Sequence, residues 1–503
     1  ASVLSCSAGY RGVAAQVGPG EANLHSFFWH DYETFGANPV RDRPVQFAGV
    51  RTDLDLNVIG EPMTLYCRPS DDYVPAPQAT LVTGITPQDC LKEGLPEAEF
   101  IQRINEALRV PQTCGVGYNN LRFDDEVTRQ TLYRNLRDPY AREWMDGNSR
   151  WDIIDMLRLA YAVRPEGIEW PHRTDGAPSF RLEDLTAANG IDHGEAHDAM
   201  ADVRATIALA QLVRTRQPRL YDYVFNNRGK ASVLSMLDLT SARPVLHVSA
   251  MYPARLGCCA LVVPVAGHPR NPNSIIVYDL RQDPGWLAEA SPDQIRERLF
   301  RGGEEMQDGE QRPALKEVRA NTCPVLAPAG MLRKIPESRL EAFGLDRDRL
   351  DSNLKALRSA TGLSERIRAA YEQAPESGEP DPDLALYAGG FLSRSDRALL
   401  DEVLETPPDL LGELEPAFGD SRLPELFFRY RARNYPESLD AEEQERWLAF
   451  RKERLLEPGN GWRSLPDYFR ELEDLFMSTD LTRKQALLLE DLKYYGESLL
   501  PYM

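Results

Sequence analysis

Phe27-Phe28-Trp29-His30-Asp31-Tyr32-Glu33-Thr34-Phe35-Gly36 is a run of apolar residues that leads into two carboxylates. In a β-strand, residues i and i+2 point to the same face, so Asp31 and Glu33 would lie about 7 Å apart along one side of the chain. Two carboxylates this close repel each other unless a cation lies between them. The segment therefore predicts a strand that ends in part of a metal site, although a D-x-E also arises by chance in an acidic chain.

Two later segments add further acidic residues. Gly117-Tyr118-Asn119-Asn120-Leu121-Arg122-Phe123-Asp124 ends in a third carboxylate, and His197-Asp198-Ala199-Met200-Ala201-Asp202 joins a histidine to a fourth. The alanine-rich run that follows predicts a helix. Five residues on one helix span about 500° of rotation, so His197 and Asp202 could not share a face. We therefore expect His197 in the loop before the helix and Asp202 in its first turns.

Together the three segments resemble the DEDDh family of 3′→5′ exonucleases, in which D-x-E-T, a later Asn-x3-Asp and a final His-x4-Asp form one two-metal site. The sister subfamily carries Tyr-x3-Asp in the last motif; because position 198 is aspartate, the histidine form is indicated. Within the family, the chain resembles bacterial exonuclease I, which is specific for single-stranded DNA. This resemblance is carried by residues 30–36, 122–129, 196–202, 215–220, 323–327 and 430–434, and so covers nearly the whole chain.

The expected fold class is α/β plus β barrel plus α. Residues 27–217 alternate strand-like and helix-like segments, as in the ribonuclease-H-like (DnaQ-like) exonuclease domain that the resemblance implies. Residues 218–370 contain short strands with turn signals, which predicts a small barrel, and the resemblance labels it SH3-like. Residues 371–383 are acidic and proline-rich, which predicts a linker, and residues 384–503 have the pattern of a helical C-terminal domain. Residues 1–26 lack the features of a signal peptide and are expected to be a disordered extension.

Composition limits the possible classes of protein. The 503 residues suggest two or three domains, and no apolar stretch approaches the ~18 residues that span a bilayer. The seven cysteines are scattered and include no C-x-x-C, which favours a reducing, cytoplasmic setting over disulfides or a zinc site. A net charge of −20 appears unfavourable for binding DNA. Bound Mg²⁺ would invert the sign locally, however, and basic residues can gather along one groove.

The resemblance implies processive 3′→5′ hydrolysis of single-stranded DNA to 5′ mononucleotides, in DNA repair and recombination. It implies that Asp31 bridges two metal ions, that Glu33 and Asp202 complete the inner site, and that Asp124 holds the outer ion. Oxygen ligands favour Mg²⁺, with Mn²⁺ as a substitute. His197 would be the general base that deprotonates the attacking water, kept neutral by the two nearby ions. The other histidines are expected to be structural or exposed.

Substrate contacts are expected from Thr34, Phe35 and Asn120. The segment 427–435 mixes aromatic and cationic residues, as single-strand binders do. Helical spacing cannot place all of them on one face, so we expect about half in the core and only the arginines at the surface. The DNA contacts expected there are Arg429, Arg431 and Arg433.

A protein partner is also implied. The resemblance to exonuclease I suggests recognition of the acidic, apolar C-terminal tail of single-stranded-DNA-binding protein, because a terminal carboxylate calls for arginine in a pocket with apolar walls. The positions that match the family's basic pocket are Arg164, Tyr223, Arg243, Arg333 and Arg358. The resemblance also implies a monomer without membrane attachment.

Two alternatives remain open. A DEDDh exoribonuclease would use the same catalytic residues, but such chains are commonly short, whereas the resemblance here extends through a long C-terminal region. A non-catalytic single-strand-binding scaffold would have lost at least one acidic ligand, and all four carboxylates and the histidine are present. The residues alone do not decide processivity, the discrimination of DNA from RNA, the oligomeric state or the role of residues 1–26.

Overall fold

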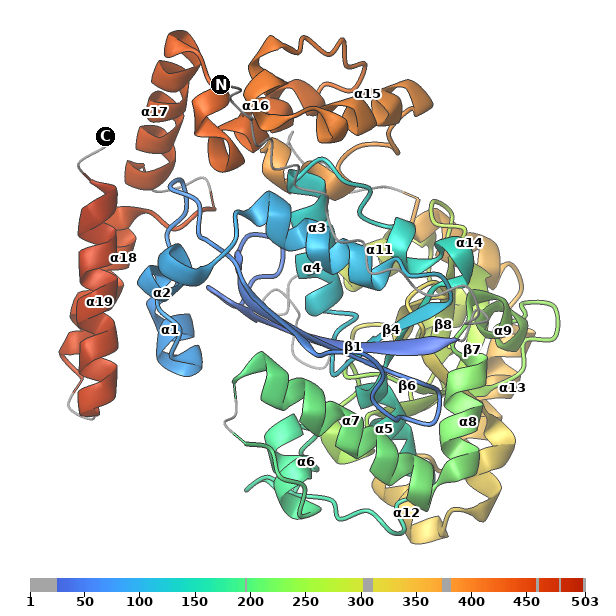
Figure 1. Cartoon of the computed structure of the whole chain (residues 1–503). Helices are drawn as coiled ribbons and strands as arrows, with labels where there is room; N and C mark the ends of the chain where they lie inside the picture. Colours follow the sequence, from blue (N-terminus) through green and yellow to red (C-terminus); the bar gives the residue numbers. More distant parts are fainter. Residues whose placement is uncertain are drawn as a thin grey trace, which may run out of the picture.

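The computed structural model describes residues 25–194, 197–301, 311–372, 381–457, 461–478 and 481–500. The predicted extension at residues 1–26 lies outside these ranges up to residue 24, and Ser26 already begins the first strand. Three regions follow one another along the chain: a mixed sheet with helices, a second sheet, and a layer of helices (Figure 1). This order agrees with the predicted fold class.

The first region is built on a five-stranded sheet in the order β3-β2-β1-β4-β5. Its strands are β1 (Ser26–Thr34), β2 (Pro44–Thr52), β3 (Met63–Tyr66), β4 (Thr113–Gly117) and β5 (Ser149–Asp152). β1 pairs antiparallel with β2 and parallel with β4, and β4 pairs parallel with β5. The segment that carries the D-x-E motif is therefore the central strand of the sheet.

The side chains of β1 alternate between two covered faces, as the period of a strand requires. Phe27 and Trp29 belong to one apolar cluster, while Phe28 and Tyr32 belong to another. The second cluster includes residues of α3 (Glu97–Leu108) and α4 (Asp124–Arg134). The first includes residues of α5 (Ile153–Val163), α7 (Ala199–Arg216) and α8 (Pro218–Asn227). Asp31 and Glu33 thus share the face of α7.

The second region, after α9 (Lys230–Met236), is a five-stranded antiparallel sheet in the order β10-β6-β7-β8-β9. Its strands are β6 (Val245–Val248), β7 (Cys259–Gly267), β8 (Ser274–Asp279), β9 (Leu315–Arg319) and β10 (Val325–Pro328). The helices of this region are α10 (Gly285–Glu289), α11 (Pro292–Phe300), α12 (Glu337–Ala342), α13 (Arg347–Ser359) and α14 (Leu363–Ala370).

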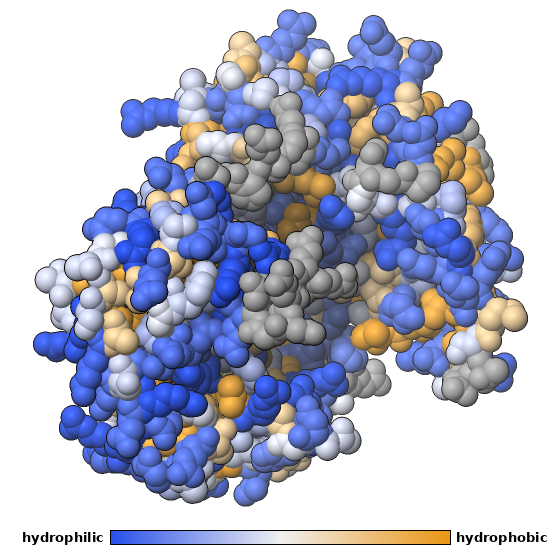
Figure 2. Space-filling view, turned by 180° about the vertical axis from the view of Figure 1, so that it is seen from behind, coloured by the Kyte–Doolittle hydropathy of each residue, from blue (hydrophilic) through white to orange (hydrophobic). Residues whose placement is uncertain are grey.

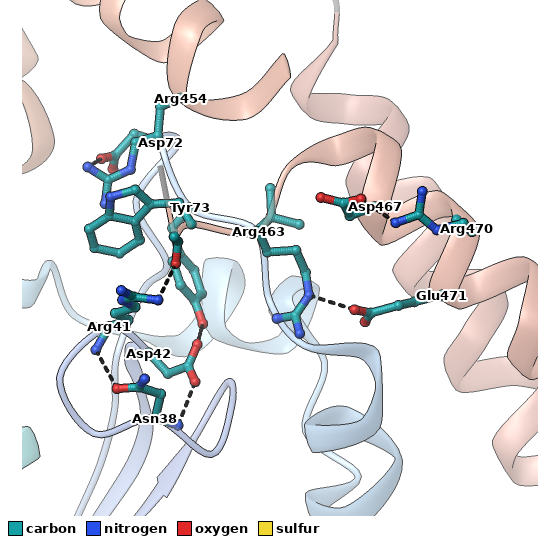
Figure 3. A pocket seen from close by; sticks show the side chains of 13 residues that line it. Asn38, Arg41, Asp42, Asp72, Tyr73, Arg454, Arg463, Asp467, Arg470 and Glu471 are labelled. Atoms are coloured by element: carbon teal, nitrogen blue, oxygen red, sulfur yellow. Dashed lines mark hydrogen bonds and ion pairs between the residues drawn. The ribbon is translucent and has the colours of Figure 1, made fainter. Parts of the chain in front are cut away.

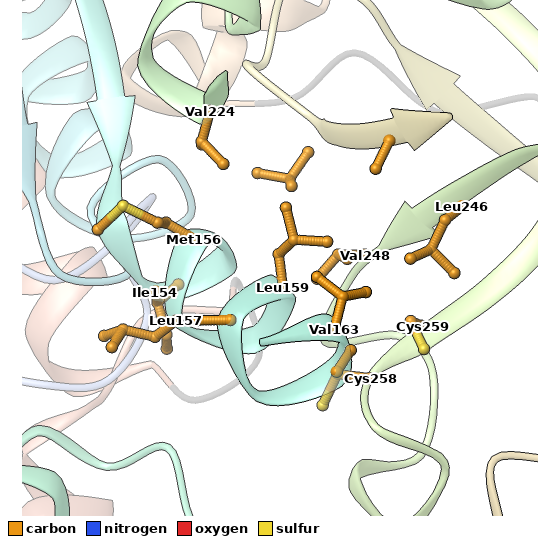
Figure 4. Packing of buried hydrophobic residues seen from close by; sticks show 14 of the residues in the cluster. Ile154, Met156, Leu157, Leu159, Val163, Val224, Leu246, Val248, Cys258 and Cys259 are labelled. Carbon is orange, nitrogen blue, oxygen red and sulfur yellow. The ribbon is translucent and has the colours of Figure 1, made fainter. Parts of the chain in front are cut away.

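One apolar core joins the first two regions. Helix α5 contributes Leu159 and Val163 to a cluster that also contains Leu246 and Val248 of β6 and the adjacent thiols Cys258 and Cys259 (Figure 4). Both cysteines are buried free thiols. Because the shared core is large and apolar, it opposes movement of one region against the other.

The C-terminal region is helical, as predicted. Its helices are α15 (Arg394–Glu405), α16 (Leu423–Asn434), α17 (Ala441–Leu456), α18 (Leu465–Phe476) and α19 (Arg483–Leu499), preceded by the 3₁₀ turn η6 (Pro382–Tyr387). Residues of α17, α18 and α19 form an apolar cluster with Val74 and Leu81 of the first region, beside α1 (Pro77–Thr83) and α2 (Pro87–Glu93) (Figure 1).

The predicted linker falls mostly outside the described ranges, which resume at residue 381. Among the described residues, no helix is long and apolar enough to cross a membrane. Figure 2 shows a largely hydrophilic surface with a hollow near the middle of this face.

Candidate active site

Four carboxylates meet where β1 ends and where two helices begin. Asp31 and Glu33 lie at the end of β1, Asp124 is the first residue of α4, and Asp202 lies in the first turn of α7. The backbone N–H of Tyr32 donates to Oδ1 of Asp124 over 3.0 Å, which fixes α4 against β1. Gly117, the last residue of β4, lies close to β1, because a Cβ there would come within 2.9 Å of the His30 carbonyl oxygen. The absence of a side chain lets the loop between β4 and α4 approach β1.

Burial raises the pKa of all four carboxyl groups, and for Asp31 and Glu33 the charges of the other site carboxylates raise it further. For Glu33, burial and then the charges of Asp202 and Asp124 raise the pKa from 4.5 to about 8. For Asp31, burial and then the charges of Asp124 and Asp202 raise the pKa well above its ordinary value. The four groups therefore form one electrostatic unit that favours either protons or a cation.

His197 lies just before α7 and its side chain is exposed, as the sequence predicts. A ligand atom of His197, one of Glu33 and one of Asp202 all lie within 4.8 Å of one another. Its backbone has φ of 68°, in the left-handed region that costs a non-glycine residue about 1–2 kcal/mol. Asp198 caps α7 by accepting hydrogen bonds from the N–H groups of Met200 and Ala201, so it is a neighbour and not a ligand.

His193 is a site residue that the sequence reasoning missed. Its Nε2 lies 2.5 Å from Oδ1 of Asp202, and its Nδ1 lies 3.1 Å from the Thr186 hydroxyl. Metal-binding carboxylates are commonly oriented by such hydrogen bonds. The position of His193, four residues before His197, was the available signal, but only the folded loop brings it to Asp202.

Asp124 and Asp125 are adjacent but have opposite electrostatic surroundings. Burial, then the charge of Asp125, raises the pKa of Asp124. Burial alone would also raise the pKa of Asp125, but Arg142 and Arg150 outweigh it and lower that pKa. Asp125 is therefore paired with arginines, whereas Asp124 has no such partner among the described residues.

The donor set fits divalent cations. Carboxylate oxygens are the ligands that Mg²⁺ and Mn²⁺ prefer, and here they come from a rigid central strand and two helix N-terminal turns. Neither Asp31 nor Asp124 forms an ion pair with a lysine or arginine in the described parts of the chain. Their negative charge is therefore available to an ion.

The predicted substrate contacts near the site are buried in this structure. Phe35 is 1% exposed and its ring packs against Tyr73, so its contact with a nucleotide stays a prediction. The Thr34 hydroxyl is buried and donates to the carbonyl of Gly36 over 2.6 Å. Asn120 is 0% exposed, and its predicted contact with substrate likewise stays a prediction.

The prediction that the three arginines of α16 reach solvent is wrong. Arg429, Arg431 and Arg433 are 5%, 4% and 4% exposed. Arg433 lies between the buried carboxylates of Asp72 and Asp383, at 2.8 and 2.6 Å. Arg429 pairs with Asp381 and Asp383, and Arg431 pairs with Glu443. Paired guanidinium groups can be buried, and these connect the first region to the C-terminal helices.

Exposed aromatic side chains lie instead along α4 and the turns beside it. Trp144 is 67% exposed, Tyr387 55% and Phe391 84%, and the rings of Phe391 and Tyr140 are 6.1 Å apart. Tyr387 donates to Glu126, two residues beyond Asp124. Sequence reasoning missed this surface because its members come from two regions of the chain.

The residues predicted to bind a partner's tail lie around β6, β10 and α5. Arg164 follows α5, and the Tyr223 hydroxyl donates to the Leu326 carbonyl of β10 over 2.9 Å. Arg243, Arg333 and Arg358 are exposed. Arg358 donates to the carbonyl of residue 242, directly before Arg243. These contacts place Tyr223 against β10 and Arg358 beside Arg243.

A cavity of about 520 Å³ separates the first region from the C-terminal helices and does not include the four carboxylates (Figure 3). Arg454 and Trp462 stack at 3.6 Å on one side, and the Tyr73 hydroxyl donates to Asp42 on the other. Its lining carries equal numbers of arginines and acids, so it shows no preference for an anion or a cation.

Three family models match the chain in sequence. Residues 28–210 match an exonuclease model, residues 228–373 match the exonuclease I SH3-like domain, and residues 380–499 match the exonuclease I C-terminal domain. Exodeoxyribonuclease I of Escherichia coli is 47% identical over 94% of this chain and 98% of its own length.

Solved structures agree over the whole fold. Exonuclease I of Methylocaldum szegediense aligns with a TM-score of 0.90 at 52% identity, covering 94% of this chain and 99% of that one. E. coli exonuclease I with a dA16 oligonucleotide aligns with a TM-score of 0.90 at 46% identity, covering 95% and 100%. Similar structures include a zinc-bound E. coli complex with single-stranded DNA and an SSB/Exonuclease I structure with an inhibitor.

Proposed function

The chain belongs to the exonuclease I family, and from this membership we propose that it is an exodeoxyribonuclease that degrades single-stranded DNA. We propose further that it acts processively from the 3′ end, releases 5′ mononucleotides, and serves DNA repair and recombination. The observation that carries this proposal is the meeting of Asp31, Glu33, Asp124 and Asp202 with His197 at the end of β1. The six described cysteines are free thiols, which fits a reducing cytoplasm.

The four carboxylates would hold two Mg²⁺ ions, and Mn²⁺ would substitute for them. When bound, the ions supply charge stabilisation to the attacking and leaving oxygens of the phosphodiester. The imidazole of His197 accepts the proton of the attacking water, and its exposed loop lets it approach the substrate from outside. His193 orients Asp202 through its Nε2. The two helix N-termini favour the negative charges of Asp124 and Asp202.

DNA would approach along the exposed aromatic surface of Trp144, Tyr387 and Phe391, which the half-buried Tyr140 supports. Bases of any sequence stack on such rings, which suits an enzyme that must pass every base. Arg129 lies 5.5 Å from the Tyr140 ring and holds that ring in place beneath the exposed aromatics. This replaces the buried arginines of α16 as the proposed route.

A protein partner would bind on the far side of the second region. The exposed arginines Arg243, Arg333 and Arg358, with Arg164 and Tyr223, are proposed to receive the C-terminal tail of single-stranded-DNA-binding protein. The structure of SSB/Exonuclease I supports a partner of this kind. We also retain the proposed division into residues 27–217, 218–370 and 384–503.

The test compares DNA and RNA oligonucleotides with free or blocked 3′ ends, in Mg²⁺ or in EDTA. We expect mononucleotides only from single-stranded DNA with a free 3′ end, and no product in EDTA or with Asp31→Ala. His197→Ala should lower the rate by about 10²–10⁴-fold. Preference for RNA would support an exoribonuclease, and tight DNA binding without cleavage would support a scaffold.

A further inference from the structure

The first turn of α4 carries three consecutive acids with different partners. Asp124 accepts a hydrogen bond from the backbone N–H of Tyr32, at 3.0 Å. The next two acids, Asp125 and Glu126, instead enter a network of ion pairs that begins on α4. The members of this network are Asp125, Glu126, Glu143, Arg129, Arg142 and Arg150.

Asp125 is the centre of this network. It is 0% exposed, and its two oxygens lie 2.8 Å from Arg142 Nη2 and 2.9 Å from Arg150 Nη1. Arg150 also donates to the carbonyl oxygen of Asn321 in the second region over 2.9 Å. A carboxylate this deeply buried cannot contact DNA, so any effect on the reaction must act through its neighbours.

The remaining contacts close the network. Arg150 Nη2 lies 3.1 Å from Glu143, Arg129 lies 2.7 Å from Glu143, and the same arginine lies 2.6 Å from Glu126. The hydroxyl of Tyr387, from the C-terminal region, donates to Glu126. The network therefore receives contacts from all three regions of the chain.

The charges of this network balance without Asp124. Three acids face three arginines, and no arginine forms an ion pair with Asp124 in the described ranges. Each guanidinium is already matched by carboxylates, so none is driven to seek another acid. Asp124, one residue before Asp125, therefore has no arginine partner among the described residues and stays available to a cation.

We propose that Asp125 is a positioning residue: by binding Arg142 and Arg150 it prevents them from neutralising Asp124, and so preserves Asp124 as a ligand for a divalent cation. This inference rests on the proposed function, because it assigns Asp124 to the metal site. A merely structural role would make loss of the acid and loss of an arginine equally harmful, whereas this role gives them opposite effects on the affinity for a cation. Loss of the acid should weaken cation binding, whereas loss of an arginine should not.

The variants follow from this difference in sign. In Asp125→Asn the network has one positive charge in excess, and the freed guanidinium is attracted to Asp124. In Arg142→Gln the excess charge is negative, which favours a cation. In the double variant Asp125→Asn/Arg142→Gln the charges balance again. Asp383→Asn is the matched control, because Asp383 is likewise 0% exposed and paired with arginines, far along the chain in η6.

The experiment titrates Mn²⁺ into the full chain by isothermal calorimetry, without DNA. We expect Asp125→Asn to bind Mn²⁺ at least about tenfold more weakly than the wild type. Arg142→Gln should bind at least as tightly as the wild type, and the double variant should return to within about threefold of it. Asp383→Asn should lower the melting temperature and leave the affinity for Mn²⁺ unchanged.

Wild-type affinity in Asp125→Asn, or a double variant as weak as Asp125→Asn, would overturn the inference. So would Arg142→Gln binding more weakly than the wild type, and this variant decides the question if Asp125→Asn alone does not fold. If the wild type itself binds no Mn²⁺, the proposed metal site fails, and that failure is distinct from failure of the positioning role.

Discussion

The crowding of carboxylates at the end of β1 should make the metal-free protein less stable as the pH rises. Glu33 is the group for which the effect can be worked out, since burial and the charges of Asp202 and Asp124 raise its pKa from 4.5 to about 8. That difference corresponds to about 5 kcal/mol between its protonated and ionised forms. The folded protein therefore binds this proton more tightly than the unfolded chain.

The sign of the pH dependence follows from linkage. A group whose pKa is raised in the folded state contributes its full stability below about pH 4.5 and loses it as the pH rises to about 8. Glu33→Gln cannot ionise, so the variant should escape this loss. In EDTA we expect the variant to melt at nearly the wild-type temperature near pH 4.5 and above it at pH 8.

The assay is thermal melting of the full chain in EDTA across this pH range, with the exposed residue Glu61 changed to Gln as the control. Glu61→Gln should follow the wild type at every pH. Adding Mg²⁺ at about 100 times its dissociation constant should stabilise the wild type by about 2.7 kcal/mol and the Gln variant by less. A Glu33→Gln variant that melts at or below the wild-type temperature at pH 8 in EDTA would refute the reasoning.

Two further predictions concern binding surfaces. Trp144→Ala should weaken binding of single-stranded DNA in EDTA by about 1–3 kcal/mol in fluorescence anisotropy, because a base loses its stacking partner. Phe476→Ala on α18, which also removes an exposed aromatic ring, is the control. Unchanged binding by Trp144→Ala would remove this residue from the DNA route. Arg243→Ala should weaken binding of an acidic peptide with a free C-terminal carboxylate by about tenfold or more in calorimetry, and amidation of the peptide should do the same. Arg397 is also exposed, and Arg397→Ala should leave the affinity unchanged. Equal affinity in all variants would contradict the proposed pocket.

Local pattern was sufficient for much of the site. The apolar run that leads into carboxylates at i and i+2 predicts a strand with Asp31 and Glu33 on one face, and β1 places them so. The five-residue spacing of His197 and Asp202 predicts a loop followed by a helix, and α7 begins at Ala199. The helical pattern predicted for residues 384–503 is likewise present, in α15 to α19. These features depend on the period of strand and helix, which the chain expresses residue by residue.

Whether a charged side chain is buried or exposed depended on contacts between segments that are distant in sequence. Arg433 was expected at the surface because an isolated guanidinium is costly to bury, yet Asp72 and Asp383, far away in sequence, bury it in ion pairs. The same holds for Asp125, whose partners Arg142 and Arg150 follow it by 17 and 25 residues. A sequence states which residues carry charge and with what period they recur. Only the tertiary structure decides which charges meet, because pairing, and not residue type, determines whether a charge can leave water.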